Sequence, residues 1–226
     1  MKSIKKILIL FTVIMSTNLI QAQEKSKKSL DIGVDFANRY VWRGLEFSDS
    51  PVIQPYVEFV SGNFTLGAWA SYEAGGQVVG QEFDFYADYS FGVVSIGFTD
   101  YAFPVDGVSD GYFQIKNHIG EVLITFNGLE KFPLTAIFGV NVYNDDANSI
   151  YTELGYPFAI GETKLNAFIG GGNEMYSTNS AYKITNFGIS ASKDIKITTS
   201  FSLEVTASTV FNPDTEDAYL VFVLSI

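Results

Sequence analysis

Acidic side chains recur with a period of two along one short segment, Glu82–Phe91 (EFDFYADYSF), which we call the acidic strand. Glu82, Asp84 and Asp88 share one face with Tyr86, because successive side chains of a strand point to opposite sides. The opposite face carries mainly phenylalanine and tyrosine. Two like charges about 7 Å apart repel by roughly 2.4 kcal/mol at an effective dielectric near 20, so these carboxylates need water, cations or arginines. The pattern predicts a hydrated, cation-attracting lumen on one side and lipid on the other, as in a transmembrane β-barrel.

The sequence has only two arginines, Arg39 and Arg43. Both are predicted to point into the lumen near its outer end. In one interpretation they form the cationic half of a constriction opposite the acidic strand, because a guanidinium pairs bidentately with carboxylates. In the other, each pairs with a neighbouring carboxylate such as Glu58 and holds the wall together.

Residues for catalysis are sparse. His118 is the only histidine, cysteine is absent, and no serine near His118 lies in a nucleophile motif. The acidic pairs Asp145-Asp146 and Glu216-Asp217 lack the ligand spacing of a dedicated calcium site. We therefore predict a protein without enzymatic activity, cofactor or bound metal.

The elements that must position these residues are short alternating segments of about nine to twelve residues, the length with which a tilted strand crosses a bilayer. We predict an all-β fold, a single twelve-stranded antiparallel transmembrane β-barrel. Its strands are expected at 30–44, 52–60, 64–72, 82–91, 93–103, 115–127, 134–143, 150–158, 165–172, 182–191, 201–211 and 219–226. In the first, Tyr40 and Trp42 are expected on the outer surface, in an aromatic girdle. The sixth changes phase near Gly120, which predicts a bulge there or an earlier turn.

Side chains on the inward faces of these strands define the candidate site. The predicted lumen-lining and selectivity residues are Arg39, Arg43, Glu58, Trp69, Glu82, Asp84, Tyr86, Asp88, Tyr101, Glu153 and Glu204. Asp31, Asp35 and Glu121 are also expected to face inward. Twelve strands lie between eight, where side chains fill a barrel, and sixteen, where a water channel remains. The lumen is therefore either a cation-preferring path or an internal polar plug.

Connections alternate between short turns and longer polar loops, which is the pattern of short periplasmic turns and longer extracellular loops in outer-membrane barrels. We expect residues 106–110 and 145–148 at the cell surface and residues 128–131 in the periplasm.

The first residues have a basic start, a short apolar run and a small residue at Ala22, as in a secretory signal peptide. We predict a signal peptide at 1–22, a short periplasmic lead-in at 23–29 and the barrel at 30–226. Cleavage removes three of the 14 basic residues and none of the 25 acidic ones, which leaves a net charge of −14. Such an acidic protein is an unsuitable partner for nucleic acid.

The segment YVWRGLEFSDSPVIQP, residues 40–55, resembles the TorF family of porins, a conserved hypothetical family of Gram-negative bacteria. Matching features are Tyr-x-x-Arg-Gly at 40–44, Ser48-Asp49 with Gln54-Pro55, Gly67 with Trp69, and Glu82-x-Asp84-x-Tyr86. The resemblance covers the first half of the chain well and the second half mainly by strand spacing. It implies an outer-membrane barrel with a porin function.

We therefore expect a narrow outer-membrane channel for small solutes, with a cation preference. The alternatives are a structural or adhesive barrel with a plugged lumen and, less favoured, an outer-membrane lipase or protease. A soluble ligand-binding barrel is disfavoured because its outer faces would need charge. Expected partners are outer-membrane lipid and lipopolysaccharide, small solutes or ions, and the barrel-assembly machinery, which would bind through the last strand, residues 219–226.

Overall fold

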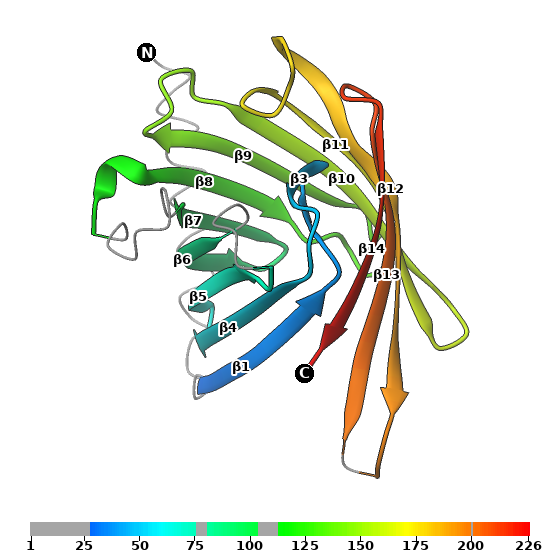
Figure 1. The fold of residues 1–226 in the computed structure, drawn as a ribbon. Coiled ribbons are helices and arrows are strands. Elements are labelled where there is room, and N and C mark those ends of the chain that lie inside the picture. Colours follow the sequence, from blue (N-terminus) through cyan, green and yellow to red (C-terminus); the bar gives the residue numbers. More distant parts are fainter. Residues whose placement is uncertain (1–27, 76–80, 104–112, 200) are drawn as a thin grey trace.

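A closed barrel of twelve antiparallel strands forms the molecule, and a separate two-stranded sheet lies inside it (Figure 1). The computed structural model describes residues 28–75, 81–103, 113–199 and 201–226; the predicted signal peptide lies outside these residues. The barrel strands are β1 (Lys28–Ala37), β4 (Val52–Ser61), β5 (Phe64–Glu73), β6 (Glu82–Phe91), β7 (Val94–Ala102), β8 (His118–Phe126), β9 (Thr135–Tyr143), β10 (Ile150–Ile160), β11 (Thr163–Glu174), β12 (Ser180–Lys196), β13 (Ser202–Asn212) and β14 (Asp217–Ser225). The inner sheet consists of β2 (Tyr40–Trp42) and β3 (Leu45–Ser48). In the described part of the chain, no helix is long and apolar enough to cross a membrane.

The barrel closes where β1 pairs with β4 on one side and with β14 on the other. Asp35 lies opposite Ser225 in the β1–β14 pair. Asn38 extends this closure, since its side chain accepts from the backbone N–H of Phe222 at 2.8 Å and donates to the carbonyl of Leu220 at 3.1 Å. Closure pairs the edge strands, whose backbone groups would otherwise remain open to other chains. The predicted twelve-stranded antiparallel barrel is thus confirmed.

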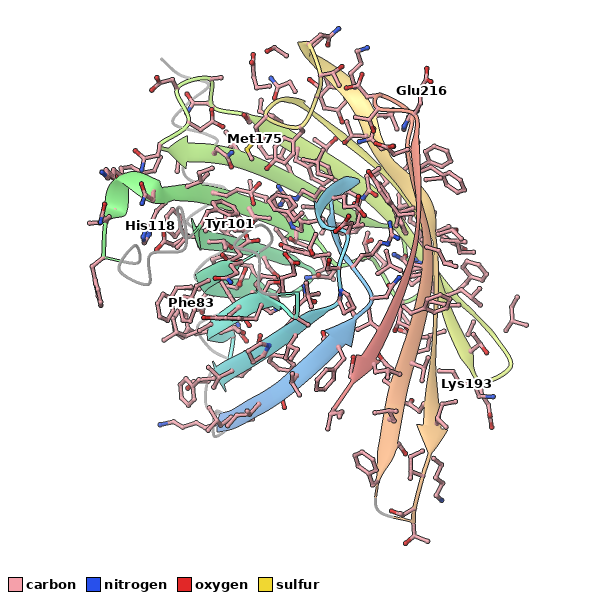
Figure 2. All side chains as sticks on the ribbon, viewed as in Figure 1. Phe83, Tyr101, His118, Met175, Lys193 and Glu216 are labelled. Atoms are coloured by element: carbon pink, nitrogen blue, oxygen red, sulfur yellow. The ribbon has the colours of Figure 1, made fainter. Side chains whose placement is uncertain are left out.

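The acidic strand is β6, with the predicted bounds and the predicted faces. Glu82 and Asp84 point inward and are only 5% and 7% exposed. Phe83 and Phe85 point outward and are exposed, and Figure 2 shows Phe83 on the outer side of the wall. Other strands share this division, so the outer surface of the barrel is covered by apolar side chains, among them Leu30, Ile32, Leu66, Ile96, Phe98, Phe138, Leu154, Ile169, Phe187, Ile189, Leu220, Phe222 and Leu224.

The predicted irregularity near Gly120 is a bulge. The β8–β9 register shifts between Gly120 and Glu121, and a short 3₁₀ helix at Ile115–Asn117 precedes β8. The strand therefore begins at His118, three residues later than expected, and the Nδ1 atom of His118 lies 2.9 Å from the Asp100 carboxylate. The bulge turns Glu121 into the lumen opposite Asn141.

The prediction for the first strand is wrong beyond Ala37. The segment expected to continue to Gly44 leaves the wall, and it forms the β2–β3 hairpin inside the barrel. Its tip is a two-residue turn with positive φ at Arg43 (53°) and Gly44 (79°), as a tight hairpin with primed-turn geometry requires. Tyr40 and Trp42 therefore do not belong to an outer aromatic girdle.

Connection lengths alternate as predicted except at 127–134, which is expected to be a short turn but is longer than 144–149, 175–179 and 213–216. One end of the barrel carries the connections at 62–63, 92–93, 127–134, 161–162 and 197–201. The other end carries 38–51, 74–81, 103–117, 144–149, 175–179 and 213–216. We call the second the outer end; the segment 106–110 lies outside the described residues.

Candidate functional site

The β2–β3 hairpin, residues 40–48, crosses the lumen at its outer end, and we call it the lumen hairpin. Its side chains and backbone reach β6, β8, β12 and β13, strands on different sides of the closed ring. A segment can touch all of these walls only from within the barrel, and Figure 1 shows β3 inside the ring of strands. The hairpin therefore constricts the lumen.

Arg43 anchors the hairpin tip to the far wall. Its guanidinium donates to both carboxylate oxygens of Glu121, at 2.6 and 2.9 Å, and to the hydroxyl of Tyr176 at 2.7 Å. The Cζ atom of Arg43 also lies 4.2 Å from the ring centre of Trp42 and 4.4 Å from that of Tyr151, within the range of cation–π attraction. Burial alone would lower the pKa of the Arg43 guanidinium, but the hydrogen bond to Glu121 raises it above its ordinary value, so the group stays charged.

The backbone of the tip is also held by the wall. Asn212 donates from Nδ2 to the Gly44 carbonyl at 3.0 Å, and the Thr185 hydroxyl donates to the Arg43 carbonyl at 3.4 Å. Gly44 is required here for two reasons: its φ is positive, and a Cβ would clash with the carbonyl of Thr185. Side chains of the wall thus pair both turn carbonyls directly.

The base of the hairpin rests on the acidic strand. The Tyr40 hydroxyl donates to Glu82 at 2.7 Å, and its ring packs against Trp69 and Phe47. Burial, followed by the charge of Glu82, raises the pKa of the Tyr40 phenol well above its ordinary value. The hydroxyl therefore stays protonated and remains a donor. Asp84 lies beside this contact, and its Oδ1 atom is buried without a hydrogen-bond partner among the described residues.

Below the hairpin the lumen wall remains acidic and more open. Tyr86 donates to Glu58 at 3.0 Å, and Tyr56 donates to Asp31 at 3.3 Å. The Tyr86 ring lies over Gly67, where a Cβ would clash with it. These contacts fix the tyrosine rings flat along the wall, so the carboxylates keep defined positions in the lumen. Asp88 is half-buried on the same wall.

The opposite wall carries a lysine cluster and a tyrosine–amide cluster. Lys164 lies 3.1 Å from Glu204 and 3.6 Å from Asp194, with all three side chains well exposed. Glu153 accepts hydrogen bonds from Tyr151 at 2.6 Å and from Asn186 at 2.8 Å. No group of three or more histidine, aspartate or glutamate side chains in the described residues is placed to hold a metal ion.

The structure divides the predicted lumen residues into three sets. Trp69, Glu82, Asp84 and Tyr101 lie against the lumen hairpin; Glu58, Tyr86, Asp88 and Glu204 lie in the wider part of the lumen; and Glu153 lies between them beside Asn186.

Both arginines pair with carboxylates, as the second interpretation predicts, but with Glu46 and Glu121 instead of Glu58. Arg43 pairs with Glu121 instead of the acidic strand, because the turn carries its side chain to the far wall. Arg39 stays near the mouth, where it lies 2.8 Å from Glu46 of β3 and 6.0 Å from the ring centre of Tyr219. The constriction with both arginines facing the acidic strand is therefore not formed.

Several residues of the constriction were not predicted. Tyr151, Tyr176, Thr185 and Asn212 all contact the tip, yet they lie far from it in the sequence and carry no shared motif. The sequence does contain a pattern that indicates the hairpin. Arg43-Gly44 stands between two short segments that each contain aromatic and aliphatic residues, as a two-residue hairpin turn does.

The chain matches a known family model. Residues 21–217 match the family model Gcw_chp, described as a bacterial protein of unknown function. No curated protein matches the chain. The match covers most of the barrel, including the lumen hairpin.

Proposed function

The chain belongs to the Gcw_chp family, whose description names no activity, and we propose that it is a narrow outer-membrane channel for small solutes in which the lumen hairpin forms the constriction. The observation that carries this proposal is the chemical contrast between the two surfaces of the barrel wall. Apolar side chains cover the outside, whereas carboxylates, hydroxyls and amides line the inside. Transmembrane barrels use this arrangement, since their strands alternate between lipid and a polar interior.

Membrane insertion is supported by the outer surface. Large apolar side chains such as Leu66, Phe85 and Phe98 are exposed on neighbouring strands. Water-soluble proteins seldom expose continuous apolar surface of this kind, because burying it is favourable. A lipid environment, reached after export by the predicted signal peptide and insertion by the barrel-assembly machinery at residues 219–226, removes this surface from water. Outer-membrane lipid and lipopolysaccharide are the corresponding partners.

A preference for cations follows from the lumen charges. Among the described residues, Arg43, Lys164 and Lys183 lie at inward-facing positions, and each is paired with a carboxylate. Asp31, Glu58 and Asp88 face the wider lumen without an arginine or lysine ion pair within the described part of the chain. Rings of carboxylates in a narrow pore favour cations over anions. The resemblance of the first half of the chain to the TorF porins is a separate argument for a channel and carries no information on ion preference.

The second candidate is a structural or adhesive barrel with a permanently plugged lumen. It is favoured by the cross-lumen contacts of the hairpin, which connect its base to β6 and its tip to β8 and β13. Conductance distinguishes the two functions.

A hairpin-less variant provides the test. Ala37 and Val52 are paired across β1 and β4, so residues 39–50 can be replaced by a short Gly-Ser linker without changing the barrel register. Asn38 and Pro51 are kept because they bond to β14 and to Ala74. In planar bilayers, wild type should give small, cation-selective steps and the hairpin-less variant larger ones. A folded wild type that never conducts, together with a hairpin-less variant that does, would favour the plugged barrel. If neither conducts, the channel function is excluded.

A further inference from the structure

Backbone pairing does not attach the lumen hairpin to the barrel. β2 and β3 pair with each other in their own two-stranded sheet, and neither belongs to the barrel ladder. The polar contacts of the hairpin with the wall use side chains on at least one partner, as at Tyr40–Glu82 and Arg43–Glu121. The hairpin can therefore move away from the wall without breaking any backbone hydrogen bond between barrel strands.

The wall groups around the Arg43 guanidinium are held in place by contacts that do not involve Arg43. The Glu121 carboxylate accepts a hydrogen bond from Tyr101 at 2.7 Å, and it lies over Gly139, where a Cβ would clash with it. Tyr151 donates to Glu153 at 2.6 Å and accepts from Asn186 at 3.0 Å. The site is thus preorganised by the barrel itself, which lowers the cost of binding.

The chemistry of this site matches one class of cation. Glu121 offers two oxygens in the plane of a guanidinium, Tyr176 offers a third acceptor, and the rings of Tyr151 and Tyr176 lie 4.4 and 5.5 Å from the Cζ atom. A planar guanidinium uses the fork geometry and the ring faces together, whereas an ammonium group is a compact point charge. Glu121 is fully buried with Arg43 in place, so the cation at this site compensates its charge.

We propose that the lumen wall holds a binding site for guanidinium cations, formed by Glu121, Tyr151 and Tyr176, and that Arg43 is its tethered occupant in the closed state. A solute that carries a guanidinium group competes with Arg43 for this site and releases the hairpin tip. Guanidinium-bearing small molecules are then the solute class that the channel recognises. This last step rests on the proposed channel function, but the binding site does not.

Binding of methylguanidinium to the Arg43→Ala variant tests the site directly. Arg43 already has a positive φ with a Cβ present, so alanine adds no new kind of backbone strain there. In detergent micelles, calorimetry should give a dissociation constant on the order of 1 mM for methylguanidinium, which is accessible to so small a ligand. Methylammonium, which has the charge without the fork, and urea, which has a planar shape without the charge, should bind at least about tenfold more weakly.

Two matched variants control for nonspecific binding. Arg39→Ala removes the other arginine, whose ion pair with Glu46 is partly exposed, and should create no methylguanidinium site. Glu121→Gln in the Arg43→Ala background should weaken binding by about tenfold or more, because the ligand loses a charged, bidentate acceptor. Equal binding to Arg43→Ala with and without the Glu121→Gln substitution would place the ligand elsewhere and overturn the proposal.

The hairpin-less variant keeps the test decisive if Arg43→Ala does not fold. Its wall site is empty in the same way, although it lacks the ring of Trp42. Methylguanidinium should raise its thermal midpoint, and methylammonium should not. No shift with either cation would overturn the site.

Conductance separates this proposal from the proposed function. Methylguanidinium should raise the open probability of the wild-type channel and leave the hairpin-less channel without this response. Methylguanidinium binding to Arg43→Ala, with no conductance in the wild-type or the hairpin-less protein, would uphold the site and refute the channel. Conductance without methylguanidinium binding to Arg43→Ala would uphold the channel and refute the site.

Discussion

Arg43 and Glu121, 78 residues apart in the chain, share two hydrogen bonds of 2.6 and 2.9 Å across the barrel lumen. Their side chains are only 9% and 0% exposed, so each charge depends on the other for compensation. The pair joins the tip of a hairpin that leaves the wall after β1 to the bulged part of β8. It therefore couples the constriction to the opposite wall.

The free energy of unfolding should fall more when one member of this pair is replaced than when both are replaced. Arg43→Met leaves the Glu121 carboxylate without its counter-charge, and breaking such a buried pair costs about 3–5 kcal/mol. Arg43→Met with Glu121→Gln leaves no buried charge, so urea unfolding in lipid vesicles should show a smaller loss for the double variant. Additive losses in this cycle would mean that the two residues do not interact.

An arginine on the outer face of β6 should reduce the folding yield, whereas an arginine on its inner face should not. Phe85→Arg places a charge on the outer surface and should reduce folding yield in lipid, because an arginine at the bilayer midplane costs about 2–4 kcal/mol. Tyr86→Arg, one residue on, places the charge in the lumen near Glu58 and should fold normally. Band-shift electrophoresis reports both yields. Equal yields for the two variants would contradict the assignment of the faces.

The acidic strand could be predicted from sequence, whereas the lumen hairpin could not be predicted by the same reasoning. In β6 the alternation opposes carboxylates to phenylalanines, so only one orientation is physically reasonable. At Tyr40 and Trp42 the alternation of β1 continues, and aromatic side chains suit a lipid girdle as well as a packed lumen. Alternation of apolar residues indicates that one face of a strand is in apolar surroundings. It does not show whether those surroundings are lipid or the interior of the protein.

The sequence also could not predict which carboxylate pairs with Arg43. Glu121 was expected to face inward, but its position opposite the hairpin tip depends on closure of the barrel and on the bulge at Gly120. The turn at Arg43-Gly44 was recognisable in principle from its positive-φ requirement at the glycine.

The carboxyl group of Asp145, in the outer loop at 144–149, should titrate at an unusually low pH. Partial burial alone would raise the pKa of Asp145, but hydrogen bonds from Ser149, Asn141 and Ala147 outweigh it and lower the pKa. A lowered pKa means that the stabilisation is fully present above the unfolded value of about 3.9 and is lost as the pH falls through the folded value. The amide chemical shifts of Ala147 and Ser149 should therefore change with a midpoint below about 3.9. A midpoint at or above that pH would show that the carboxylate is not held as described.

Orientation can be tested with single cysteines, because the chain has none of its own. Ala147 lies in an outer loop and is exposed, and Glu162 lies in a turn at the opposite end. A membrane-impermeant thiol reagent should label Ala147→Cys on intact cells and Glu162→Cys only after the outer membrane is opened. The reverse pattern would invert the proposed topology.

The last prediction concerns which carboxylates set ion selectivity. Glu82 and Asp84 lie behind the lumen hairpin and are nearly buried, whereas Glu58 and Asp88 face the wider lumen. Replacing Glu58 and Asp88 with their amides should therefore reduce the cation preference of the wild-type channel, measured as the reversal potential in a salt gradient.

The same amide replacements at Glu82 and Asp84 provide the matched comparison. They should have a small effect in wild type, because the hairpin separates them from passing ions, and a larger one in the hairpin-less variant. High salt should weaken every one of these differences, since the Debye length falls from about 10 Å at 0.1 M to 3 Å at 1 M. A larger effect of Glu82 and Asp84 than of Glu58 and Asp88 in wild type would mean that ions pass between the hairpin and β6, and that the hairpin does not cover the acidic strand in the conducting state.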